Sequence, residues 1–131
     1  MSDNVQATRR MLDAWDSGDL SGWAAGLHDD VTWIPLVENT QTEPIQGADA
    51  TLAFVMDWIK PWEAYSIHEL EIREAGDDQV VLSTRQVGRL PGGAEVAMDM
   101  HAVGTFHDGK LFEMRWFTHK PDALEAAGLA K

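Results

Sequence analysis

Apolar residues follow a helical spacing in the first half of the chain and an alternating, strand-like spacing in the second. Within residues 4–16, Met11, Leu12 and Trp15 fall on one face at spacings of three and four, which predicts an amphipathic helix. Ser17-Gly18-Asp19 interrupts this helix, and Pro61 limits a later one. The helices predicted in this way cover residues 4–16, 20–27, 47–59 and 121–129, and one short strand covers residues 31–36.

From residue 65 onward, alternating segments are separated by turn residues. The turns are Gly76-Asp77-Asp78, Pro91-Gly92-Gly93 and Asp108-Gly109. The strands between them cover residues 65–74, 79–90, 95–106 and 111–119, and a polar loop is expected at residues 37–45. Three helices with one embedded strand, followed by a four-strand meander, predict a single α+β domain over residues 1–131 in which helices cover the sheet.

The composition argues against several classes of protein. The chain has 22 acidic and 10 basic residues and a formal net charge of −12, which disfavours nucleic acid and anionic membranes as partners. It has no cysteine, so disulfides and thiolate chemistry are excluded. No signal peptide or membrane span is recognisable, so we expect a cytoplasmic protein. No histidine pair has metal-ligand spacing and no glycine-rich phosphate loop follows a strand, so we expect neither metal nor cofactor.

Six tryptophans are many for 131 residues. Tryptophan buries a large flat surface, and it is typical of cores, ligand pockets and subunit interfaces. The residues that we expect to shape an apolar cavity are Met11, Trp15, Trp33, Met114 and Trp116.

Two hairpin registers bring polar residues of the late strands together. If Pro91-Gly92-Gly93 form a three-residue loop, Arg85 pairs with Asp99 and Ser83 with His101. If Asp108-Gly109 form a two-residue loop, His101 pairs with Trp116. The single face predicted from these registers carries Ser83, Arg85, Asp99, His101, Met114, Trp116 and Thr118.

This face has the groups that proton transfer needs, provided that it lines a pocket. Arg85 would bind Asp99, and Asp99 would raise the pKa of His101 toward the range in which a general acid–base works best. The opposite orientation is also open, because the other face of the same strand, with Met98 and Met100, is more apolar. Arg85 and Asp99 would then form an exposed ion pair.

Two stretches carry a family pattern. The first runs from AWDSGDL (14–20) to DDVTW (29–33), and the second runs from GTFHDGKL (104–111) through WFTH (116–119) to DALEAAGL (122–129). Both resemble the nuclear-transport-factor-2-like superfamily, which includes ketosteroid isomerase, limonene epoxide hydrolase and the SnoaL polyketide cyclases. The resemblance implies a cone-shaped α+β barrel, in which a curved antiparallel sheet wraps around helices. It also implies a homodimer formed through the outer sheet face and the Met98 and Met100 row.

The catalytic residues of these relatives are largely missing. The resemblance places the tyrosine of ketosteroid isomerase at Met11, its aspartate base near Pro35 and its protonated carboxyl at His101. The cyclase histidine also falls at His101, and the cyclase aspartate at Trp116. The positions that match the Asp–Arg–Asp set of the epoxide hydrolases are Ser83, Arg85 and Trp116.

Three functions are open from the sequence. The first is a cofactor-independent lyase, isomerase or cyclase acting on a small hydrophobic carbonyl compound. In it His101 moves the proton, Asp99 and Arg85 set its charge or bind an oxyanion, and Ser83 and Thr118 contact the ligand beside the apolar wall. The second is a non-catalytic module that binds a hydrophobic small molecule. The third is a dimerisation domain whose pocket is filled by its own side chains.

Overall fold

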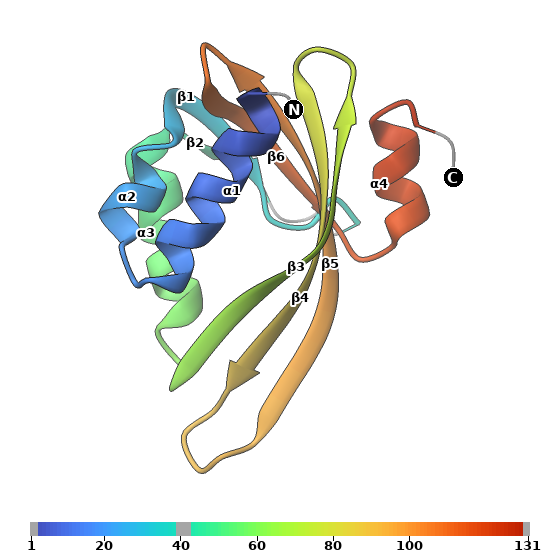
Figure 1. Cartoon of the computed structure of the whole chain (residues 1–131). Coiled ribbons are helices and arrows are strands. Elements are labelled where there is room, and N and C mark those ends of the chain that lie inside the picture. The colour runs from blue at the N-terminus through green and yellow to red at the C-terminus, as the bar shows by residue number, and fades with distance from the viewer. Residues whose placement is uncertain (1–2, 39–42, 130–131) are drawn as a thin grey trace.

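A computed structural model describes residues 3–38 and 43–129 as one six-stranded sheet with four helices (Figure 1). The helices are α1 (Asp3–Asp16), α2 (Leu20–Ala24), α3 (Ala48–Ile59) and α4 (Lys120–Ala126). The strands are β1 (Leu27–Ile34), β2 (Ile45–Gln46), β3 (Ala64–Ala75), β4 (Gln79–Arg89), β5 (Glu95–His107) and β6 (Lys110–Phe117). None of the helices in these residues is long and apolar enough to cross a membrane.

The predicted helices and strands are all present, but the predicted end of the second helix at residue 27 and both predicted ends of the first strand, at residues 31 and 36, are wrong. Leu27, predicted at the end of the second helix, instead begins β1, because α2 ends at its cap Ala25. The backbone N–H of Leu111 donates to the carbonyl of Gly26 at 2.8 Å, and this bond joins the segment to β6. Leu27 is therefore part of a strand and not of a helix. Hydrophobic periodicity alone does not distinguish the two at the boundary of an element.

The curved α+β sheet is confirmed, although it is not antiparallel throughout. β1 runs parallel to β6, with Trp33 beside Met114, whereas the other four pairs are antiparallel. β2 lies at the end of the segment predicted as a loop, where Ile45 pairs with Trp33; residues 39–42 of that loop lie outside the described part. The strand order β2-β1-β6-β5-β4-β3 leaves β2 and β3 as edges, so the sheet curls without closing.

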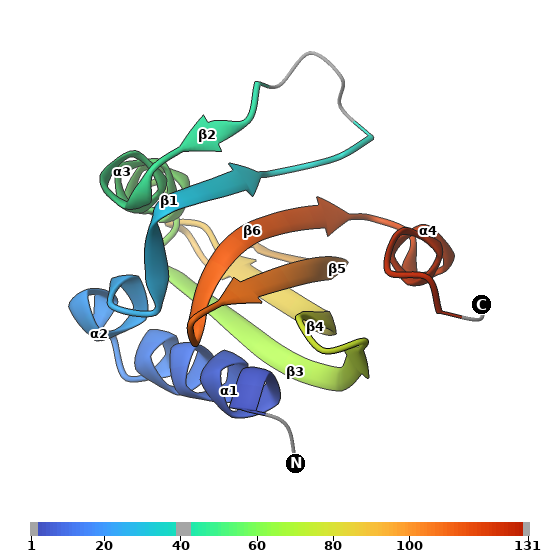
Figure 2. The ribbon, with the colours of Figure 1, turned by 90° about the horizontal axis from the view of Figure 1, so that it is seen from above.

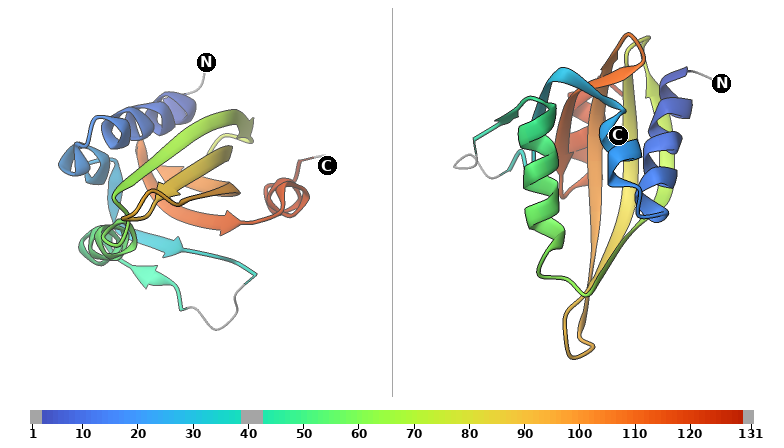
Figure 3. Two further views of the ribbon diagram at one scale, coloured as in Figure 1. Left: turned by 90° about the horizontal axis from the view of Figure 1, so that it is seen from below. Right: turned by 90° about the vertical axis from the view of Figure 1, so that its left-hand side faces the viewer.

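Helices cover both sides of this sheet. Helices α1, α2 and α3 lie on the concave side, and α4 lies against the convex side (Figures 2 and 3). Beneath α4 a small outer core contains Val81, Val103 and Phe117 together with Ala123 and Leu124 of the helix. Because β4 and β5 pack apolar side chains on both faces here, burial along β4 is nearly continuous and shows little alternation.

The first predicted hairpin register is correct. Arg85 pairs with Asp99 and Ser83 pairs with His101, as a three-residue loop after Leu90 requires. All four residues therefore lie on the same face of β4 and β5.

The second hairpin has the predicted two-residue turn but not the predicted register. Asp108 and Gly109 have φ angles of 55° and 78°, the left-handed pair that a tight hairpin turn of type I′ needs. A β-bulge then adds Phe112 as an extra residue in β6. His101 consequently pairs with Phe117, and the predicted pairing with Trp116 is wrong.

This shift of one residue moves a whole row of side chains to the other face of the sheet. Met114 and Trp116 pair with Gly104 and Ala102, so they share a face with Met100 and not with His101. The extra residue, Phe112, has its own partners: its ring stacks on His107 at 4.1 Å and meets the edge of His28 at 5.1 Å between centroids. The predicted single polar face is thus divided between the two sides of the sheet.

Candidate ligand-binding pocket

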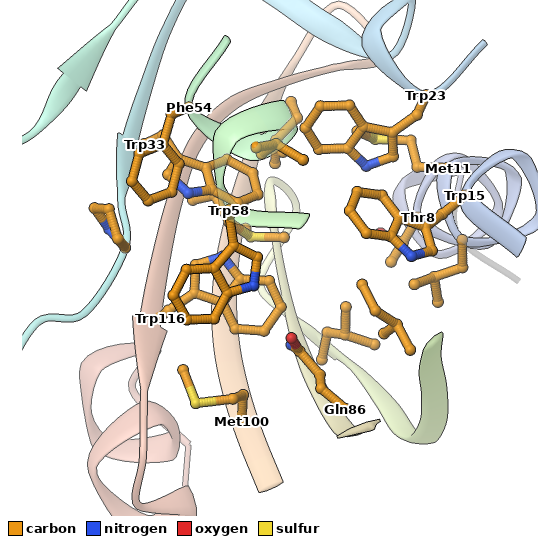
Figure 4. Close-up of a pocket in the computed structure, with 18 of the residues that line it drawn as sticks. Thr8, Met11, Trp15, Trp23, Trp33, Phe54, Trp58, Gln86, Met100 and Trp116 are labelled. Atoms are coloured by element: carbon orange, nitrogen blue, oxygen red, sulfur yellow. The ribbon is translucent and has the colours of Figure 1, made fainter. Parts of the chain in front are cut away.

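A cavity of about 500 Å³ lies between the concave face of the sheet and helices α1–α3 (Figure 4). Each of these helices supplies part of its wall: Met11 comes from α1, Trp23 from α2 and Phe54 from α3. The sheet supplies residues such as Leu82 and Met100. The volume falls within the roughly 300–1,000 Å³ of typical small-molecule sites.

Five of the six tryptophans line this cavity, namely Trp15, Trp23, Trp33, Trp58 and Trp116. Successive rings touch: Trp15 meets Trp23 at 5.9 Å, Trp23 meets Trp33 at 5.8 Å, and Trp33 meets Trp116 at 6.1 Å between centroids. The indoles therefore form one continuous aromatic wall from α1 across α2 and β1 to β6 (Figure 4). Trp58 is 45% exposed, so it stands where the cavity meets solvent.

Among the described residues, no side chain that carries a full charge or an imidazole lines the cavity. The polar groups on its wall are the indole N–H groups, the hydroxyls of Thr8, Tyr65 and Thr118, and the amide of Gln86. Nor do the described residues bring together three histidine or acidic side chains that would hold a metal ion. An unpaired charge placed in such surroundings would lose its hydration without compensation.

Gln86 is the most deeply buried amide of this wall, with 7% of its surface exposed. The hydroxyl of Tyr65 donates to its Oε1, and its Nε2 donates to the Oγ1 of Thr84 at 3.3 Å. Burial raises the pKa of Tyr65 above its usual 10.0, although a hydrogen bond with Trp58 opposes the shift. Tyr65 therefore keeps its proton at neutral pH and cannot act there as a base.

Thr118 lies at the cavity wall just beyond the end of β6, where it is tied to the segment after β1. Its backbone N–H and its hydroxyl both donate to Oε1 of Glu38, at 2.8 and 3.0 Å. Burial is the largest single influence and acts to raise the pKa of Glu38, but the hydrogen bonds from Thr118 and from the backbone of Glu38 itself, together with nearby His119, outweigh it and the pKa is lowered. A further bond, from the N–H of Val37 to the carbonyl of Trp116, holds the same junction at 2.8 Å.

The structure separates the predicted site residues into two groups. The group that lines the cavity consists of Met11, Trp15, Trp33, Met114, Trp116 and Thr118. That these six contact a ligand stays a prediction. The group that does not line it consists of Ser83, Arg85, Asp99 and His101.

The second group lies on the convex face, next to α4, which corrects our expected orientation. Arg85 Nε contacts Asp99 Oδ1 at 2.9 Å, and both side chains are about half exposed, at 55% and 46%. The hydrogen bond from Arg85 lowers the pKa of Asp99. This is the exposed ion pair of the alternative orientation, and the sheet separates it from the cavity.

His101 is buried on that convex face, with Nδ1 2.9 Å from Oγ of Ser83. Burial lowers the pKa of His101, and the opposing effect of Asp99 is smaller. The predicted rise in the pKa of His101 is therefore wrong, because loss of solvent outweighs the nearby carboxylate.

The convex orientation changes the expected dimer contact as well. Met98 and Met100 point into the cavity, so their row does not belong to the outer surface through which we expected a homodimer. The homodimer itself stays a prediction.

Several cavity residues were missed in the sequence, and one of them had a readable signal. Gln86 has the same parity along β4 as Val80, Leu82 and Thr84, so it is the one amide in a row that is otherwise apolar or carries a hydroxyl. A polar side chain in such a row is either satisfied internally or directed at a ligand. Tyr65 and Trp58 had no comparable signal, because they reach the cavity from an edge strand and from the end of α3.

The fold and the cavity define a class: α+β cones whose curled sheet and covering helices enclose one apolar pocket. A family model described as a SnoaL-like domain matches residues 8–114. The chain belongs to this SnoaL-like family. No curated protein matches the sequence.

Solved structures share the fold at low identity. RV0760c from Mycobacterium tuberculosis, in complex with estradiol-17beta-hemisuccinate, has a TM-score of 0.77 at 19% identity, with 94% of this chain and 98% of that chain covered. A putative SnoaL-like polyketide cyclase from Jannaschia sp. CCS1 has a TM-score of 0.75 at 20% identity, covering 98% and 94%. A Delta 5-3-ketosteroid isomerase from Mycobacterium sp. has a TM-score of 0.74 at 21% identity, covering 94% and 97%. These similarities establish the shared fold.

Proposed function

We propose that this protein binds an uncharged, ring-bearing hydrophobic small molecule in the concave cavity. One observation carries the proposal: a cavity of about 500 Å³ to whose wall the described residues contribute five tryptophans and no charged side chain. Flat indole faces favour flat apolar guests, because ring-to-ring contact adds to the free energy of burying apolar surface.

The fold neighbours support this class of ligand. The structure of one of them contains estradiol-17beta-hemisuccinate, whose fused rings fit this class although its succinate end carries a carboxylate, and another is a ketosteroid isomerase. A fused-ring molecule of steroid size is therefore the first guest to test. At identities of 19% and 21%, however, the transfer rests on the cavity of this chain and not on conserved residues.

Proton transfer by His101 is not part of the proposal. His101, Asp99 and Arg85 lie on the opposite side of the sheet from the cavity, and a catalytic acid or base must reach the reacting proton directly or through one water. Within the cavity, the one titratable side chain among the described residues is Tyr65, whose pKa is raised. Binding is thus the function that the wall supports best.

The test is a titration with estradiol, followed by tryptophan fluorescence and calorimetry. We expect saturable quenching with one molecule per chain, together with a rise in the melting temperature. Met100→Trp would fill the cavity from β5 and should weaken binding at least tenfold. The matched control Ala97→Trp adds the same indole to the convex face of the same strand and should bind as the wild type does.

Two results would contradict the proposal. One is a wild type that shows neither quenching nor heat with estradiol or with smaller aromatic hydrocarbons. The other is equal weakening by Met100→Trp and Ala97→Trp, since this would place the ligand outside the cavity.

A further inference from the structure

We propose that Gln86 presents a fixed N–H donor to the cavity and thereby selects ligands that carry a carbonyl oxygen. This inference rests on the proposed function, because it names a chemical group of the molecule that the cavity would bind. It follows from the direction of a chain of hydrogen bonds that crosses the wall from β5 to α3.

The series of hydrogen bonds begins at the backbone carbonyl of Met100, which can only accept. The hydroxyl of Thr84 donates to the backbone carbonyl of Met100 at 2.9 Å, and this uses the only hydrogen of that hydroxyl. Any further partner of the Thr84 oxygen must therefore be a donor. The side chain of Gln86 lies 3.3 Å from this oxygen, so the atom that faces Thr84 must be Nε2 and not Oε1.

The position of Nε2 also determines which partner the amide oxygen of Gln86 faces. With Nε2 toward Thr84, Oε1 faces the hydroxyl of Tyr65 and accepts its hydrogen. The Tyr65 oxygen is then free to accept the indole N–H of Trp58, which can only donate. Every hydrogen bond in the chain has one allowed direction, so the amide of Gln86 is held in one of its two flipped orientations.

One hydrogen remains unassigned. An amide nitrogen carries two, and the hydrogen bonds of the described residues account for one of those on Gln86, the one given to Thr84. Figure 4 shows the Gln86 side chain reaching into the space that the indoles enclose, with its amide at the tip. The second N–H is therefore available to a guest in an otherwise apolar cavity.

The indole N–H groups on the wall favour the same kind of guest. The indole N–H groups of Trp15, Trp23, Trp33 and Trp116 are donors without acceptor capacity. A hydrocarbon guest would bury the Gln86 N–H without a partner, whereas a carbonyl oxygen would satisfy it. A carboxylate would also satisfy it, but the wall offers no cation to offset the loss of hydration. The geometry therefore favours a neutral ketone or quinone.

The experiment compares fluorenone with fluorene, two flat tricyclic molecules that differ by one carbonyl oxygen. We expect the wild type to bind fluorenone more tightly than Gln86→Met does, whereas fluorene should bind the variant at least as tightly as the wild type, because the variant has no N–H to leave unpaired. The affinity for fluorenone divided by the affinity for fluorene should be about two- to tenfold higher in the wild type than in the variant, which is the usual net effect of one hydrogen bond. The carbonyl band of bound fluorenone in infrared spectra should lie at lower frequency in the wild type than in the variant.

A second variant controls for loss of stability in the first. Gln86→Met leaves the Tyr65 hydroxyl without its acceptor, so the double variant Tyr65→Phe with Gln86→Leu removes both partners at once. It should bind fluorene at least as tightly as the wild type and should lose the preference for fluorenone.

The outcomes separate this inference from the proposed function. If the wild type binds both molecules but shows the same relative affinity and the same carbonyl band as the variants, the inference is overturned and ligand binding stands. If neither molecule binds the wild type, the proposed function fails, and the inference fails with it.

Discussion

The two faces of strands β4 and β5 differ in chemistry although they are made from alternating residues of the same segments. The concave face carries Leu82, Gln86 and Met100 and forms the wall of a cavity. The convex face carries the Ser83–His101 pair and the Arg85–Asp99 pair, partly beside α4 and partly in solvent. These four residues resemble an active site in the sequence, but in the structure they lie on the side of the sheet that faces away from the cavity.

Residue types that are common in active sites are therefore weak evidence for a site until the face of the sheet on which they lie is known. Arginine, aspartate, histidine and serine are typical catalytic residues, yet here they satisfy one another across two strands. The cavity, by contrast, is built from tryptophan, methionine and one amide. Four measurements test whether the two faces differ in this way.

The largest effect is expected for a truncation beneath the concave face. Leu111 is 1% exposed and belongs to the inner core, so Leu111→Ala should lower the free energy of unfolding by about 2–5 kcal/mol. Urea denaturation measures this change. Leu70→Ala is the matched control, because Leu70 is 52% exposed on β3 and its truncation should change stability little. Equal losses in the two variants would show that the inner core is not placed as described.

The second prediction contrasts the two faces in binding. Trp116→Ala removes an indole from the aromatic wall and should weaken estradiol binding about tenfold, consistent with lost ring contact and lost apolar burial. His101→Ala changes the opposite side of the sheet and should leave the affinity unchanged. Calorimetric titration of both variants checks this. Weaker binding in His101→Ala alone would return the convex face to the functional site.

A smaller loss is expected from breaking the buried polar pair of the convex face. Ser83→Ala leaves Nδ1 of His101 without its partner at 2.9 Å and should lower the free energy of unfolding by about 1 kcal/mol. Ser83→Thr keeps the hydroxyl and should recover part of the loss. Urea denaturation of the two variants, compared with the wild type, measures the difference; no loss in Ser83→Ala would mean that the pair does not stabilise the fold.

The smallest effect is a dependence of stability on pH. The pKa of His101 lies below its usual 6.5 in the folded protein, because burial disfavours the imidazolium. The unfolded chain therefore binds the proton more readily, and stability should fall as the pH drops below 6.5 toward the folded pKa. His101→Gln should show a shallower decline over the same range.

The neighbouring carboxylate gives this last prediction a second readout. Asp99 opposes the burial effect on His101, so Asp99→Asn should lower the pKa of His101 further. A proton NMR titration of the imidazole measures both values. An unchanged or raised pKa in Asp99→Asn would contradict the assigned electrostatics.

Much of the fold was predictable from local signals. The helical spacing of the first half, the turn residues between late strands and the Asp108-Gly109 hairpin all carry their information within a few residues. The pairing of Arg85 with Asp99 was also predictable, because loop length determines the register of a short hairpin. The abundance of tryptophan indicated an apolar cavity of the kind that the structure contains.

The face that lines the cavity was not predictable, for a physical reason. Helix α4 returns from the end of the chain and packs on Val81, Val103 and Phe117, so both faces of β4 and β5 are apolar in part. Periodicity cannot choose between two faces that are each half apolar. The choice then depends on the register of β6, and a register is sensitive to a single extra residue.

Local patterns in the sequence were enough to predict the order of the four helices and of five of the six strands, the family, the tight turns and an interior rich in indole. The tertiary structure alone decided which side of the sheet is inside. It did so through the bulge at Phe112, which moves Trp116 and Met114 into the cavity and leaves His101 outside. The ring of His28, which comes from β1, meets Phe112 only once β1 has paired with β6, so no local pattern encodes that contact.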